Sequence, residues 1–222
     1  MKEAGDARVG ILGGTLDPIH IGHLETARAA QRALSLTHIL VMPSRIPPHR
    51  TQGPSASMFH RFAMAALALA GEPDATVSDA ELVSDGPSFT VSTLERLVAQ
   101  GLRPSQIFFI TGADAFAEIE TWHRYPGVLD LAHFVVISRP GVPASSMPAR
   151  LPQLAARFRG ENDVASVNGP TAVFLVEAAT PDVSSTDIRR RLRAGESIAG
   201  LVPASVETHI RRHGLYSENQ HV

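Results

Sequence analysis

The stretch GGTLDPIHIGH, residues 13–23, decides how this chain folds. It directly follows the short apolar run Val9 to Leu12 and leads into a helical pattern from about Gly22 to Leu36 that contains no proline. Glycines at the end of a strand let a ligand approach the backbone closely, and the N-terminus of a helix offers unpaired N–H groups and a positive dipole end to phosphates. The stretch therefore predicts a strand, a phosphate-binding turn and a helix.

His20 and His23 stand three positions apart at the entrance of this predicted helix. That spacing lets both imidazoles reach a polyphosphate lying over the helix N-terminus, and Gly22 leaves room between them. Taken singly, a strand followed by glycines indicates only a tight connection, and a lone histidine is more often structural or solvated. The sequence has neither a GxGxxG fingerprint with its acidic partner nor a Walker A lysine loop, which disfavours a dehydrogenase or a P-loop kinase.

The rest of the chain alternates short β-rich runs with longer helical patterns. The runs are nearly continuous in apolar residues, as expected for strands buried on both faces. Strands interleaved with helices favour an α/β fold with a Rossmann-like, doubly wound parallel sheet. Strands are predicted at Ile39 to Met42, Ile107 to Ile110, His133 to Ser138 and Val173 to Val176, and helices at Ser57 to Ala70 and Thr90 to Gln100.

The 222 residues fit one domain, with a core over about residues 6–180 and a small C-terminal helical part over about residues 181–218. Two stretches interrupt the alternation. Pro43 to Pro54 is rich in proline and basic groups, and Pro140 to Pro152 is rich in proline and serine. Both are predicted to be surface loops, and the second is expected to be a variable excursion away from the functional motifs.

Composition excludes several classes of function. A formal net charge of -2 and a pI near 6.5 give no overall basic field, so no nucleic-acid partner is expected. The absence of cysteine excludes disulfides and thiolate sites and weakly favours a cytoplasmic location. The apolar run from Phe62 to Ala70 is too short to cross a bilayer, and no targeting segment is expected. The oligomeric state stays open, with a homo-oligomer among the options.

A second motif, VSSTDIR at residues 183–189, opens a helical pattern near the other end of the chain. Ser184 or Ser185 could cap this helix, and Arg189 could belong to a solvated basic face. Taken alone, the motif would indicate no more than that.

Together these stretches resemble the HxGH nucleotidyltransferase superfamily. Residues 13–23 are similar to the GGTxDPxHxGH form of its adenylyltransferase branch, with Leu16 where phenylalanine is usual, and residues 183–189 are similar to ISSTxIR, with Val183 as a mild departure. Five further stretches resemble the nicotinate-nucleotide branch in particular. They are residues 46–50 (IPPHR), 87–90 (PSFT), 112–114 (GAD), 121–122 (TW) and the closing helix over 202–216. The similarity therefore spans nearly the whole chain and points to the bacterial nicotinate-nucleotide adenylyltransferases.

The resemblance implies transfer of AMP from ATP to nicotinic acid mononucleotide, giving nicotinic acid adenine dinucleotide and pyrophosphate, with Mg²⁺ accompanying ATP. It implies catalytic roles for His20, His23 and Arg189, and no metal cage built from protein groups alone is expected. The implied ATP-binding residues are Gly13, Gly14, Thr15, Leu16, His20, His23, Gly112, Asp114, Ser184, Ser185, Thr186 and Arg189. The implied residues for the mononucleotide are His49, Arg50, Phe89, Thr90, Trp122 and His123.

Several of these residues have simpler explanations. Trp122 is the only tryptophan and would be a core residue in most proteins, Arg50 could be an exposed loop charge, and Asp114 could cap a helix. Phe89 stands where the family commonly has tyrosine, so a side-chain hydrogen bond from that position is in doubt.

Residues 87–90 and 121–123 are both predicted to begin helices, with Ser88 and Thr121 as caps. If both helix N-termini point into one pocket, as the resemblance implies, their free N–H groups would favour a carboxylate over an amide on the pyridine ring.

Two classes of alternative remain at this stage. One is another adenylyltransferase of the same fold, with a pantetheine-phosphate or nicotinamide mononucleotide acceptor. The other is a non-enzymatic nucleotide-sensing module that has kept the fold.

Overall fold

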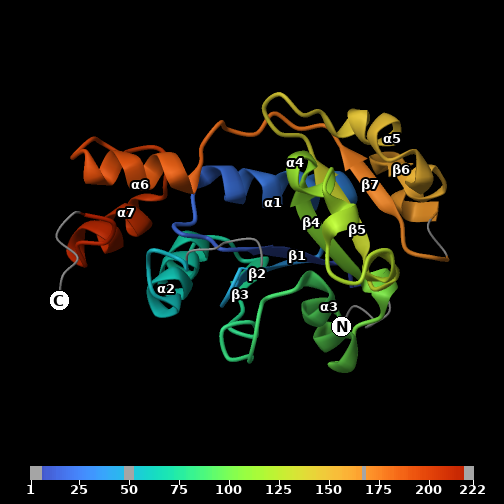
Figure 1. Cartoon of the computed structure of the whole chain (residues 1–222), viewed down its shortest axis with the longest axis horizontal. Coiled ribbons are helices and arrows are strands. Elements are labelled where there is room, and N and C mark those ends of the chain that lie inside the picture. The colour runs from blue at the N-terminus through green and yellow to red at the C-terminus, as the bar shows by residue number, and fades with distance from the viewer. Residues whose placement is uncertain (1–6, 48–52, 167–168, 218–222) are drawn as a thin grey trace.

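The computed structural model describes residues 7–47, 53–166 and 169–217, and it contains a seven-stranded sheet in which every neighbouring pair of strands is parallel (Figure 1). The strand order is β3-β2-β1-β4-β5-β7-β6. The strands are β1 (Val9–Gly14), β2 (His38–Pro43), β3 (Ala75–Val77), β4 (Ile107–Gly112), β5 (His133–Ile137), β6 (Phe158–Gly160) and β7 (Val173–Val176).

Helices connect the strands and extend the chain beyond the sheet. The α-helices are α1 (Ile21–Leu34), α2 (Met58–Leu69), α3 (Thr90–Ala99), α4 (Ala113–Phe116), α5 (Met147–Arg150), α6 (Ser185–Arg193) and α7 (Ala204–Arg212). Short 3₁₀ helices lie at Pro104–Gln106, Ile119–Thr121, Gly127–Asp130, Ala144–Ser146, Pro152–Arg157 and Glu161–Ser166. None of the helices in the described ranges has both the length and the apolar character needed to cross a bilayer.

Helices cover both faces of the sheet, and each face has its own apolar core. Leu12 and Ile11 are neighbours in β1 and point to opposite faces. Leu12 belongs to the core that also contains α1, α2 and, through Ile188 and Ile210, the C-terminal helices α6 and α7. Ile11 belongs to the core that contains Leu94 of α3. The C-terminal helices, which gather at one end of the molecule (Figure 1), therefore share a core with the first βαβ unit.

The predicted doubly wound parallel sheet is confirmed, and its predicted strands and helices match the observed ones to within a few residues. The short edge strands β3 and β6 were not predicted. Pro140 to Pro152 is also not a simple surface loop: it carries α5, and three of its side chains pack in the core because apolar residues recur there at helical spacing. These buried side chains are Ala144, Met147 and Leu151.

Candidate active site

A cavity of ≈ 360 Å³ opens at the carboxyl ends of β1 and β4. The strand order reverses between these two strands, and this is the point at which doubly wound sheets bind ligands. The wall of the cavity includes many of the residues that the sequence analysis selected. These are Gly13, Gly14, Thr15, His23, Phe89, Thr90, Gly112, Asp114, Trp122 and His123.

The two motif histidines lie against each other at the start of α1, with their ring centroids 3.7 Å apart and the ring planes tilted by 33°. His20 is the N-cap residue and is buried, whereas His23 lines the cavity. The Nδ1 atom of His23 accepts the backbone N–H of His20 at 3.3 Å. Because a neutral imidazole has one protonated nitrogen, this bond leaves the proton of His23 on Nε2 as a donor.

Both imidazoles are neutral at pH 7. Burial, together with the nearby Arg139 charge, lowers the pKa of His20 to about 4. Burial also holds the pKa of His23 well below its usual value, with smaller contributions from His20 and Arg139. Neutral imidazoles offer N–H donors rather than a positive charge. Among the described residues, the buried Nδ1 of His20 and hydroxyl of Ser44 have no hydrogen-bond partner, as expected for groups beside a ligand site.

A side chain at position 22 would crowd the start of α1. A Cβ atom at Gly22 would lie 3.0 Å from Nδ1 of His20 and 3.5 Å from the carbonyl oxygen of Pro181. The segment before α6 therefore packs directly on the start of α1. This contact brings the two sequence motifs together although they are far apart in the chain.

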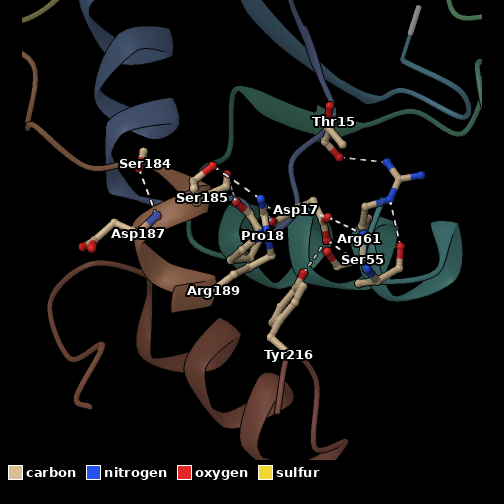
Figure 2. Close-up of polar contacts among 12 residues, drawn as sticks. Thr15, Asp17, Pro18, Ser55, Arg61, Ser184, Ser185, Asp187, Arg189 and Tyr216 are labelled. Atoms are coloured by element: carbon tan, nitrogen blue, oxygen red, sulfur yellow. Dashed lines mark hydrogen bonds and ion pairs between the residues drawn. The ribbon is translucent and has the colours of Figure 1, made fainter. Parts of the chain in front are cut away.

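The second motif contacts the loop between β1 and α1 (Figure 2). Ser184 is the N-cap of α6, and its hydroxyl accepts the N–H of Asp187 at 3.1 Å. The Ser185 hydroxyl donates to the carbonyl oxygen of Pro18 at 3.0 Å. Arg189 donates to the carbonyl oxygen of Asp17 at 2.6 Å. These residues, like Thr186, His20 and the fully buried Leu16, are not part of the cavity wall that the described residues form.

Aromatic side chains also line the cavity. The rings of Phe89 and His123 are stacked with centroids 4.3 Å apart, and the Trp122 ring meets Phe109 edge to face at 6.0 Å. Residues 87–90 and 121–123 therefore do meet at one pocket. His49 and Arg50 lie outside the described residues.

The two predicted helix caps are wrong. The N-cap of α3 is Phe89, and the Ser88 hydroxyl instead accepts the N–H of Arg45 at 2.9 Å. Thr121 ends a 3₁₀ helix rather than beginning one, and its hydroxyl donates to the carbonyl oxygen of Glu118 at 2.8 Å. Only one of the two segments thus offers a helix N-terminus to the pocket.

Arg139 is the main cavity residue that the sequence analysis missed. It lies just beyond β5, its Nε atom is 3.9 Å from Oδ1 of Asp114, and a Cβ atom at Gly112 would lie 2.7 Å from that Nε. Glycine at position 112 is thus required for this approach. The sequence did offer one signal for Arg139, because it directly follows a predicted buried strand. Ligands bind at the carboxyl ends of strands near the switch point. Other cavity residues not predicted include Thr26, Ser44, Glu81, Phe109 and Thr111.

No group of three or more histidine and acidic side chains in the described parts of the chain could hold a metal ion. The cavity wall carries the carboxylates of Glu81 and Asp114. A divalent ion acting here would therefore depend on ligands supplied by a bound substrate.

Comparisons with known proteins agree with this geometry. A model of the cytidylyltransferase-like family matches residues 11–191. A protein of Desulfatibacillum aliphaticivorans named "Probable nicotinate-nucleotide adenylyltransferase" is 40% identical over 217 residues, which cover 94% of this chain and 99% of the relative. Relatives with the same name are 41% identical in Pseudomonas syringae pv. tomato, covering 94% of this chain and 93% of the relative, and 37% identical in Yersinia pestis, covering 97% and 98%.

The fold is also found among solved structures. The nicotinic acid mononucleotide adenylyltransferase of Plasmodium falciparum complexed with NaAD superposes with a TM-score of 0.70 and covers 95% of this chain and 97% of that chain. The same enzyme complexed with APC gives a TM-score of 0.67. At 16% identity these likenesses establish the fold alone.

Proposed function

This chain belongs to the nicotinate-nucleotide adenylyltransferase family, and we propose that its cavity transfers AMP from ATP to nicotinic acid mononucleotide, releasing pyrophosphate. The observation that carries the proposal is the arrangement of the cavity itself. Its wall combines the donor of His23 with the aromatic group of Phe89, Trp122 and His123. A phosphate donor and a flat heterocycle can therefore occupy it side by side.

The nucleophile in this reaction is a phosphate monoester oxygen, which is already anionic at neutral pH. It attacks the α-phosphorus of ATP in line, a P–O bond forms to the mononucleotide, and the bond to the pyrophosphate breaks. No general base is needed. Catalysis then depends on positioning two anions and stabilising the charge that develops on the phosphoryl oxygens.

The residues of this chain suit that task. The neutral imidazoles of His20 and His23 serve as N–H donors to the phosphates, as a neutral histidine polarises an oxygen in other enzymes. The positive dipole end of α1 favours the same anion, although the N–H of Ile21 already donates to the carbonyl oxygen of Leu201 at 3.0 Å. Ser185 and Arg189 of the α6 motif hold the loop before His20 by hydrogen bonds to its backbone carbonyl oxygens. Gly112, Asp114 and Trp122 line the same cavity, where the family resemblance assigns the first two to the ribose of a nucleotide and Trp122 to the pyridine ring.

Magnesium enters this proposal as part of the substrate. ATP is used as a complex with Mg²⁺ on its β- and γ-phosphates, where the ion helps the pyrophosphate leave. The protein's part is to hold the phosphates through the N–H donors of His20 and His23.

A substrate panel tests the proposed function. We expect pyrophosphate release to be fastest when the protein is incubated with MgATP and nicotinic acid mononucleotide, and slower with nicotinamide mononucleotide or pantetheine phosphate. Pyrophosphate release with pantetheine phosphate as the only active acceptor would instead assign the chain a pantetheine-phosphate adenylyltransferase activity. ATP binding without pyrophosphate release for any acceptor would identify a nucleotide-sensing module.

Arg139 is expected to contribute to the binding of ATP. It is the one arginine or lysine among the described residues of the cavity wall, and its charge acts on both His20 and His23. Replacing it with alanine should lower kcat/KM for ATP by about tenfold to a hundredfold, the scale of one charged hydrogen bond.

The controls for this variant separate charge from geometry. Arg139→Lys keeps the charge but loses the planar fork, so it should recover only part of the loss. Arg159→Ala removes an exposed arginine on β6 and should have no effect. Wild-type kcat/KM for ATP in Arg139→Ala would exclude the assigned role.

A further inference from the structure

Asp17 lies in the loop between β1 and α1, and its carboxylate is completely buried. Its Oδ2 atom accepts the backbone N–H of Ser55 at 2.7 Å, and Oδ1 accepts that of Ala56 at 3.1 Å. Both donors lie just before α2. Because a buried charge is costly unless it is hydrogen-bonded, these contacts tie the loop firmly to the start of α2.

Arg61 of α2 holds the same region through the backbone. Its buried guanidinium donates to the carbonyl oxygens of Thr15 at 2.8 Å and Ser44 at 2.6 Å. The first carbonyl belongs to the phosphate-binding loop and the second follows β2. Arg61 therefore fixes the loop at Thr15, and the segment just before α2 fixes it at Asp17.

Arg189 reaches the loop from α6 (Figure 2). Its Nη1 atom donates to the carbonyl oxygen of Asp17 at 2.6 Å and lies 3.9 Å from Oδ2 of the same residue. The side chain of Arg189 is only 11% exposed. Asp17 is therefore a main partner of this guanidinium, together with the Thr186 hydroxyl, which accepts from its Nη2 atom at 3.4 Å.

Tyr216 completes the cluster from the segment after α7. Its hydroxyl donates to Oδ1 of Asp17 at 2.7 Å, although 199 positions separate the two residues (Figure 2). Burial, and then the Asp17 charge, raise the pKa of Tyr216 well above its usual range, so the hydroxyl keeps its proton and always donates. Tyr216 also holds a left-handed φ of 67°, which a residue with a side chain adopts rarely and only where its surroundings impose it.

The hydroxyl is not what docks the C-terminal helix. Val206, Ile210 and Leu215 are buried in the core that α1 and α2 share, and they provide apolar contacts along this segment. The Tyr216 hydroxyl adds a single polar contact, and that contact goes to the loop that leads to His20. Removing the hydroxyl should therefore leave the C-terminal helix docked and change only how the loop before His20 is held.

We propose that Tyr216 is a positioning residue for adenylyl transfer. By fixing the Asp17 carboxylate, it holds the Arg189 guanidinium and the loop before His20 in the arrangement that the ATP phosphates require. The C-terminal segment is thus a functional part of the active site. The expected effect of Tyr216 on kcat rests on the proposed function. Its expected effect on ATP binding can be measured without turnover.

Tyr216→Phe tests the proposal with the smallest change available. We expect kcat to fall about tenfold, the scale of one hydrogen bond to a charged group. The affinity for nicotinic acid mononucleotide, followed by the fluorescence of Trp122 in the cavity, should stay at the wild-type value. General loosening of the fold would weaken acceptor binding as well, which would overturn the proposal.

A double-mutant cycle with Arg189→Ala identifies the route. Arg189→Ala alone should lower kcat by about tenfold to a hundredfold. If Tyr216 acts through Arg189, adding Tyr216→Phe to this variant should have little further effect, because coupled residues are not additive. The same tenfold loss in both backgrounds would contradict the proposal.

Ser205→Ala provides the matched control. The Ser205 hydroxyl donates to the carbonyl oxygen of Leu67 at 3.0 Å and so links α7 to α2 away from Asp17. This variant should keep the wild-type kcat, and an equal loss would assign the effect to helix docking.

Absence of turnover in the wild-type protein would reject the proposed function only. Calorimetric titration with a non-hydrolysable ATP analogue then still decides the present proposal, since Tyr216→Phe must weaken that binding and wild-type affinity would overturn it.

Discussion

Replacing His23 with alanine is expected to lower turnover by about two to three powers of ten, as the loss of a preorganised donor to a developing charge does in other enzymes. His23 lines the cavity, and its Nδ1 bond to the backbone of His20 leaves the Nε2 proton available as a donor. His20→Ala should give a loss of similar size, because the two rings are in contact and the unpaired Nδ1 of His20 is buried at the helix start.

Steady-state kinetics with MgATP and nicotinic acid mononucleotide measure this effect, and thermal melting monitors the fold. His38→Ala is the control, because His38 lies at the start of β2, at the opposite end of the strand from the cavity, and contacts Thr76. Less than a tenfold loss in both active-site variants would remove the histidines from the catalytic mechanism.

Much of the fold could be predicted because its main strands are continuous apolar runs. The runs that became β4, β5 and β7 carry nearly all of their residues in buried positions, and β1 buries its central residues Gly10 to Leu12, so each had a strong local signal. The edge strands β3 and β6 have three residues each and mostly half-buried or exposed side chains. Such short segments have no periodicity that a sequence can display.

The site was predicted where motifs are local and missed where distant segments meet. Residues 13–23 carry their phosphate-binding character in one stretch, and the structure places His23 on the cavity wall. The bond between Asp17 and Tyr216 joins residues 199 positions apart, and no local pattern indicates it. Arg139 likewise becomes a site residue only through its approach to Gly112 and Asp114.

The incorrect helix caps have a physical reason. Serine and threonine favour N-cap positions, but they also hydrogen-bond to any nearby backbone group. The hydroxyl of Ser88 accepts an N–H from Arg45, which lies on a different segment, and that contact displaces the expected cap by one residue. The correction changes the account of acceptor specificity, because only α3 now directs its N-terminus at the pocket.

Nicotinic acid mononucleotide is nevertheless expected to be preferred over its amide by roughly two to three powers of ten in kcat/KM. Phe89 and Thr90 line the pocket at the start of α3, and the first amides of a helix have no partner within it. A carboxylate accepts from these amides and benefits from the positive dipole end. An amide substituent loses a charged hydrogen bond and can turn its own N–H donors toward protein donors.

Thr90→Pro tests this account of acid selection by removing a single N–H group at the start of α3. Thr90 is the first residue of α3, where proline is well tolerated, and Phe89 already has the extended conformation that precedes proline, with φ −75° and ψ 134°. The substitution therefore removes one N–H while keeping the helix. It should lower the acid-to-amide ratio of kcat/KM by about tenfold or more, whereas Thr90→Ala, which keeps the N–H, should leave the ratio unchanged. A wild-type ratio within tenfold, or an unchanged ratio in Thr90→Pro, would show that the α3 terminus does not select the acid.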